Sequence, residues 1–116
     1  MEYKVHILRF RAVNRDIFNA IKIGQKKVET RAGSTKYQSI IKGDRILFIC
    51  GKSKFRKNVY ALKKFRSIKA MLKQYKPKDV DPRCNTAVEL EKVYHSFPGY
   101  KQKLRKYGLI VMELKK

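Results

Sequence analysis

The segment "GQKKVETR" at residues 24–31 carries the residue types most able to do chemistry in this sequence. Side chains of a strand alternate between two faces, so Lys27, Glu29 and Arg31 are predicted to share one face. A carboxylate between cations stays ionised and orients Arg31, whose remaining N–H groups are then available for a phosphate or a base edge. Lys26 lies where the preceding helix and turn give way to the strand, and it is placed to reach the mouth of the same site. A lysine near other cations loses proton affinity and can act as a base or nucleophile.

The plain alternative is a solvated strand edge, where a Glu29–Arg31 pair contributes little to stability. Other kinds of site have less support. His6 and His95 lie far apart, with no cysteine or acid at ligand spacing, so the sequence predicts no metal site. The glycine patterns of phosphate- and dinucleotide-binding loops are absent, and so is a Ser/His/Asp set. We therefore expect no cofactor.

Charge is the strongest overall signal. The 116 residues include 30 Lys and Arg against 9 Asp and Glu, a formal net charge of +21. Such a chain attracts polyanions, nucleic acid first and an anionic membrane surface second; of these we expect nucleic acid, RNA or DNA, and no membrane partner. Residues 51–78 hold eleven Lys or Arg and no acid, whereas residues 79–91 hold four acids and one Arg. This distribution predicts a basic face next to a small acidic region. The alternative is a uniformly basic surface that binds polyanions without selectivity.

Aromatic residues are interleaved with the basic ones between residues 51 and 66. Cations on phosphates combined with a ring under a base are typical of single-stranded RNA binding. Phe55 falls in a predicted loop, 51–57, and is the best stacking candidate. Tyr60 is equally compatible with stacking and with core packing, whereas Phe65 is expected in the core. The predicted binding rim consists of Lys52, Lys54, Phe55, Arg56 and Tyr60.

Hydrophobic periodicity predicts a mixed α+β domain. Strands are expected at residues 3–10, 26–31, 45–50, 58–65 and 109–114. Helices are expected at 14–24, 67–75 and 86–94, with a shorter one within 97–108, and two prolines make 75–82 a loop. Short strands with helices between only some of them favour a small, mostly antiparallel β-barrel with peripheral helices.

The length suits one domain over residues 1–116, and we expect a monomer. No apolar run approaches the ~18–20 residues that cross a bilayer, and the N-terminus lacks the layout of a signal peptide. Cys50 ends an apolar run and is expected in the core, whereas Cys84 falls in a polar loop. Two cysteines of this kind indicate a reducing, cytoplasmic location.

Four short motifs, in a fixed order over nearly the whole chain, resemble an ASCH domain (activating signal cointegrator homology) of the PUA-like superfamily. The first is G-x-K-x-x-E-x-R, filled without a gap. The others are a Gly-Asp turn before an apolar strand, an aromatic-Pro pair, and a Tyr-Gly pair before the last strand. The residues that match are Gly24, Lys26, Glu29, Arg31, Gly43, Asp44, Phe97, Pro98, Tyr107 and Gly108.

The resemblance implies a small PUA-like barrel whose cleft is lined by the first motif, with RNA or nucleotides as ligands. Some members of the family are amidohydrolases that deacetylate N4-acetylcytidine with a Lys, a Thr three residues later and a distant Glu. By position Lys26 matches the Lys, Glu29 stands where the Thr does, and Asp81 is the nearest candidate for the distant Glu. This departure favours a binding role.

The leading interpretation is therefore an RNA- or nucleotide-binding domain whose cleft contains Lys26, Lys27, Glu29 and Arg31. The alternative is a small hydrolase on the same scaffold, which deacetylates N4-acetylcytidine or cleaves RNA, with Lys26 and Glu29 as catalytic residues. The sequence leaves open whether the protein is an enzyme.

Overall fold

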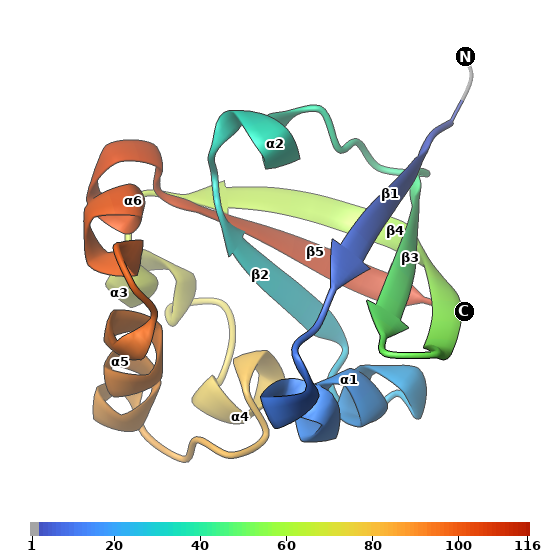
Figure 1. Cartoon of the computed structure of the whole chain (residues 1–116). Helices are drawn as coiled ribbons and strands as arrows, with labels where there is room; N and C mark the ends of the chain where they lie inside the picture. The colour runs from blue at the N-terminus through green and yellow to red at the C-terminus, as the bar shows by residue number, and fades with distance from the viewer. Residues whose placement is uncertain (1–2) are drawn as a thin grey trace.

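The computed structural model describes residues 3–116 as one curled sheet with helices on both of its sides (Figure 1). The strands are β1 (Val5–Arg9), β2 (Val28–Ala32), β3 (Arg45–Cys50), β4 (Ser53–Phe65) and β5 (Leu109–Lys115). The helices are α1 (Arg15–Lys22), α2 (Thr35–Gln38), α3 (Ile68–Met71), α4 (Pro77–Val80), α5 (Ala87–Ser96) and α6 (Tyr100–Tyr107), and a 3-10 turn (Ala12–Asn14) precedes α1.

The five strands lie in the order β1-β3-β4-β5-β2. Only the β1–β3 pair is parallel; the other three pairs are antiparallel. The first two strands of the chain thus form the two edges of the sheet. The sheet curls into a half-barrel that stays open between β1 and β2 (Figure 1). The expectation of an α+β, mostly antiparallel, barrel-like fold is confirmed at this level.

Two hydrophobic clusters lie on opposite faces of β5. Ile110, Met112 and Leu114 pack with α1 and the inner faces of β1 and β3, whereas Leu109 and Val111 pack with the helices that follow β4. A strand buried on both faces needs apolar side chains at successive positions. This requirement explains the continuous apolar sequence of the last strand, and it anchors both edges of the half-barrel to one central element.

The structure corrects two expected elements. Residues 53–57 are not a loop: β4 begins at Ser53 and forms a hairpin with β3. Gly51 permits the tight turn between them because its φ is +58°. The segment 75–82 contains helix α4, since Pro77 occupies its first position, where a missing N–H costs no hydrogen bond. Cys84 lies in a loop as expected, between α4 and α5, and its side chain is buried there.

The early start of β4 also corrects the expectation for Phe55. Alternation along the strand turns this ring inward, where its centroid lies 4.8 Å from that of Phe18 and 4.9 Å from that of Phe48. The stacking surface expected in a loop is therefore part of the core. Tyr60, by contrast, is 50% exposed at an irregular step in the pairing of β4 with β5.

Candidate functional site

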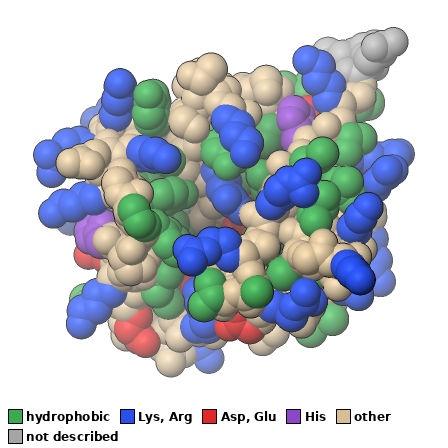
Figure 2. Space-filling model, viewed as in Figure 1, with side chains coloured by type: hydrophobic (Ala, Val, Ile, Leu, Met, Phe, Trp, Pro, Cys, Tyr) green, Lys and Arg blue, Asp and Glu red, His purple; other side chains and the backbone are tan. Residues whose placement is uncertain are grey.

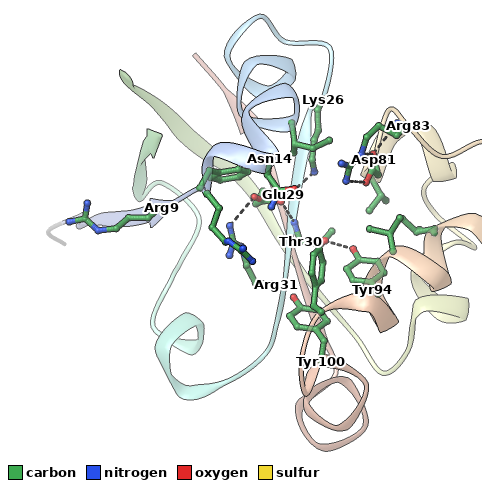
Figure 3. Close-up of a pocket in the computed structure, with 17 residues that line it drawn as sticks. Arg9, Asn14, Lys26, Glu29, Thr30, Arg31, Asp81, Arg83, Tyr94 and Tyr100 are labelled. Carbon is green, nitrogen blue, oxygen red and sulfur yellow. Dashed lines mark hydrogen bonds and ion pairs between the residues drawn. The ribbon is translucent and has the colours of Figure 1, made fainter. Parts of the chain in front are cut away.

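A pocket of about 270 Å³ lies beside the open side of the half-barrel, between the edge strands and helices α4 and α5. Lys and Arg side chains are spread over the face of the molecule that contains it (Figure 2). Five basic and two acidic side chains line the pocket together with aromatic and aliphatic ones (Figure 3). The charged residues are Arg9, Arg11, Lys26, Glu29, Arg31, Asp81 and Arg83.

One wall is an ion network around the Glu29 carboxylate. Lys26 Nζ lies 3.3 Å from Glu29 Oε1, and an Arg31 terminal nitrogen lies 3.3 Å from Oε2. The exposed fractions of the Lys26 and Glu29 side chains are only 3% and 7%. The Arg31 guanidinium also lies over the ring of Phe10, 5.4 Å from its centroid. Among residues 3–116 this guanidinium donates only to Glu29, which leaves N–H groups for a ligand.

The pKa values of this network follow from its contacts. Burial alone raises the pKa of Glu29, but Lys26, Arg31 and the Thr30 amide outweigh burial and hold this pKa below its ordinary value. Burial lowers the pKa of Arg31, yet the Glu29 carboxylate outweighs it and leaves the pKa above the ordinary value. Glu29 and Arg31 are therefore a fixed ion pair at neutral pH.

Side chains also complete the free edge of β2. Lys26 Nζ donates to the Val28 carbonyl, the Thr30 N–H donates to Glu29, and the Ala32 N–H donates to the Tyr100 hydroxyl. Unpaired backbone groups on a strand edge otherwise invite another strand. Lys26, Glu29 and Tyr100 thus satisfy backbone groups on this edge and also line the pocket.

The opposite wall comes from the helices after β4. The Tyr94 hydroxyl is hydrogen-bonded to the Thr30 hydroxyl, and burial raises the pKa of Tyr94 well above its ordinary value. The rings of Tyr94 and Tyr100 are stacked, with centroids 5.8 Å apart. Asp81 accepts two hydrogen bonds from the Arg83 side chain, at 3.1 and 2.8 Å. Burial raises the pKa of Asp81, but Arg83 outweighs burial and lowers it overall.

The structure brings together three of the four residues expected in the cleft. Lys26, Glu29 and Arg31 line the pocket, and Glu29 and Arg31 share a face as their spacing predicts. Lys27 does not line it: this residue precedes β2 and its side chain is exposed. Lys26 is buried, not placed at the mouth. Asp81 does lie in the pocket, carried there by the chain after α4.

The residues expected as a rim lie elsewhere. Lys52, Lys54, Arg56 and Tyr60 are exposed on the β3–β4 hairpin or the strand beyond it, outside the pocket lining. Sequence reasoning missed Thr30, Arg83, Tyr94 and Tyr100. The pair Asp81–Arg83, two positions apart beside Pro82, was a usable signal. Tyr94 and Tyr100 had no such signal in the sequence, because only the tertiary fold places their helices against β2.

The described residues contain neither a metal-binding group of side chains nor a membrane-spanning helix. Within residues 3–116, no group of three or more His, Cys, Asp or Glu side chains is arranged to hold a metal ion. No helix in the same range combines the length and the apolar character needed to span a membrane.

Comparison with known proteins identifies structural relatives. No family model and no curated protein sequence matches this chain. The crystal structure of hypothetical protein PH0355 matches with a TM-score of 0.81 and 28% sequence identity, over 97% of this chain and 97% of that chain. The solution structure of protein PF0455 from Pyrococcus furiosus matches with a TM-score of 0.72 and 28% identity, over 99% of this chain and 96% of that chain. Neither name states a ligand or an activity. The chain is thus similar to both structures over nearly its full length and shares their fold.

Proposed function

We propose that this protein binds one nucleotide unit, free or within RNA, in the pocket beside β2. The observation that carries the proposal is the Lys26–Glu29–Arg31 network, which presents oriented donors and an acceptor to the pocket. A base edge offers donors and acceptors side by side, and such edges are read by groups whose positions are already fixed. The net positive lining also suits a phosphate.

The proposal includes the family assignment suggested by the motifs. The half-barrel would be an ASCH domain with a PUA-like barrel, formed by residues 1–116 as a monomer. It would work in the cytoplasm, where its two free cysteines stay reduced. RNA is preferred to DNA as the polymer because of the resemblance, and duplex DNA is the comparison ligand in the selectivity test.

The test compares binding of the four nucleoside 5′-monophosphates to wild type and to Arg31→Gln. Arg31 is the suitable position because its side chain is a quarter exposed, so the variant is expected to fold. Loss of charge-assisted hydrogen bonds predicts a roughly tenfold or greater loss of affinity. Arg105→Gln on α6 makes the same chemical change at an exposed site outside the pocket, and its affinity should equal that of wild type.

Thermal unfolding of each variant first establishes that it is folded. The proposal fails if no monophosphate binds to folded wild type, or if Arg31→Gln and Arg105→Gln bind alike. Selectivity is tested with single-stranded RNA, structured RNA and duplex DNA at about 0.15 M salt. Equal binding of all three would indicate a surface that attracts polyanions without selectivity.

A second candidate function is hydrolysis of a modified nucleoside. The observation in its favour is the ammonium group of Lys26 beside a carboxylate in a pocket that also contains Asp81. The family resemblance makes N4-acetylcytidine the probe, with water cleaving its amide to acetate and cytidine. Acetate release that disappears in Lys26→Met, a folded variant, would make the protein an enzyme. If no acetate is released while nucleotide binding is retained, the hydrolase function fails and only the binding function stands.

A further inference from the structure

The outer face of β1, β3 and the first half of β4 is not covered by any helix within residues 3–116. Strand registers place three rows of side chains across it. One row runs from Val5 through Arg45 to Asn58, the next from Ile7 through Leu47 to Arg56, and the third from Arg9 through Ile49 to Lys54. Val5 and Ile7 are 49% and 45% exposed although they lie on strands.

The polar groups of this face are all cationic or neutral. Arg9, Arg45, Lys54 and Arg56 are exposed, and none of them takes part in an ion pair among residues 3–116. Exposed cations without acids near them attract a polyanion. They also repel a second copy of a chain with a net charge of +21, which argues against self-association through this face.

The face continues into the pocket through Arg9. This residue lines the pocket, yet in Figure 3 its side chain extends away from Glu29 and Asp81. Its register with Ile49 and Lys54 places it two strands from Lys54, about 10 Å across the sheet. Arg56 lies two residues further along β4, about 7 Å from Lys54. The cations therefore follow one path from the pocket mouth.

An aromatic ring lies near the far end of this path. Tyr60 is half exposed, and Lys115 Nζ lies 3.8 Å from its ring centroid. Lys115 pairs with Asn58 and so extends the first row of the outer face to β5. A ring with cations around it is suited to a base of a single strand whose phosphates contact the cations.

We infer that the outer face of β1, β3 and β4 holds the single-stranded RNA that continues from the nucleotide in the pocket. The inference rests on the proposed function and adds a second, separable surface to it. The apolar row contributes contact with riboses and bases, and Lys54 and Arg56 contact phosphates. An acidic protein segment is the competing occupant; the exposed ring of Tyr60 and the path into the pocket through Arg9 favour the nucleic acid.

The experiment uses the double variant Lys54→Gln/Arg56→Gln and a single-stranded RNA of about ten nucleotides. Affinity is measured at several salt concentrations, alongside the monophosphate that wild type binds best. Log affinity falls as log salt rises, and each lost phosphate contact makes this slope less negative by about 0.7, so the double variant should have a slope less steep by about 1.4. Monophosphate affinity should not change. Lys101→Gln/Arg105→Gln on α6 removes the same two charge types from exposed positions as a matched control.

The outcomes separate the two proposals. If monophosphate binding is retained but the RNA slope equals that of wild type, the outer face does not bind RNA, and the pocket function stands. If both double variants make the salt slope less steep by the same amount, the effect is one of net charge and the inference fails. If no monophosphate binds, the pocket function itself fails. Poly-glutamate that competes as well as RNA would assign the face to an acidic protein and overturn the inference.

Discussion

The pocket and the outer face both contain lysine and arginine side chains, but these side chains have opposite surroundings in the two regions. In the pocket, Lys26 and Arg31 are held against Glu29, and Arg83 is held against Asp81, so these cations already have carboxylate partners before any ligand arrives. On the outer face, Lys54 and Arg56 are exposed and have no acidic partner among residues 3–116. Buried charges that are paired with each other can orient a ligand, but removing one of them destabilises the fold. Exposed charges attract a ligand and contribute little to stability.

The largest difference between the regions is expected from Glu29→Gln. Removing this carboxylate leaves Lys26 buried without its counter-charge, which should lower the free energy of unfolding by about 3–5 kcal/mol. Urea unfolding at pH 7 measures the change. Lys54→Gln is the control from the outer face and should stay within about 0.5 kcal/mol of wild type. Similar losses in the two variants would remove the basis for the comparison.

The pH dependence of stability should also come from buried carboxylates. Glu29 and Asp81 have lowered pKa values in the folded protein, so the unfolded chain binds protons first as pH falls. Their stabilisation is complete above the ordinary Glu value of 4.5 and is lost as the pH drops through the folded values. Urea unfolding from pH 7 to pH 3 should show this decline. The gap between wild type and Glu29→Gln should narrow with it, and parallel curves would contradict the assignment.

A medium effect distinguishes two aromatic residues of β4. Phe55→Ala removes a ring packed on Phe18 and Phe48 and should cost about 3 kcal/mol of stability. Tyr60→Ala removes an exposed ring and should cost less than about 1 kcal/mol. Unfolding and RNA titration of both variants check the pair. An RNA defect in Phe55→Ala without loss of stability would return Phe55 to the binding surface.

The smallest effect concerns the contact between the two pocket walls. Thr30→Val leaves the buried Tyr94 hydroxyl without its partner and should cost about 1–2 kcal/mol. Tyr94→Phe should restore part of that loss when the two changes are combined, because both polar groups are then absent. A double-mutant cycle measures the coupling, which we expect near 1 kcal/mol. Additive losses would mean that the hydroxyls act independently.

Several elements were readable from local patterns. The alternation in "KKVETR" predicted that Glu29 and Arg31 share a face, and the apolar run "LIVMEL" predicted the last strand. The helix start at Thr86 followed from its spacing to Glu89, and the Thr86 side chain caps the helix by accepting a hydrogen bond from the Glu89 N–H. These features depend on residues close together in the chain, so the sequence contains their full cause.

Other features were misjudged because their cause lies elsewhere in the chain. Residues 53–57 look like a loop, since Lys and Arg interrupt them, but β3 supplies hydrogen-bonding partners along their whole length. Phe55 is then turned inward by the strand alternation and held by Phe18 from α1. Lys26 was expected at the cleft mouth because it lies between the helix and the strand; the Val28 carbonyl and Glu29 make its burial tolerable.

The sequence by itself determined the charge, the strand and helix periods, and the acid–base content of the motif segment. Only the tertiary structure decided that β1 and β2 form the edges of the half-barrel, because strand order depends on contacts between distant residues. That order placed Tyr94, Tyr100 and Asp81 opposite Glu29, and within residues 3–116 it left the outer face of β1, β3 and the first half of β4 without a covering helix. The motif supplies the ion network, and the long-range pairing of strands turns it into a pocket.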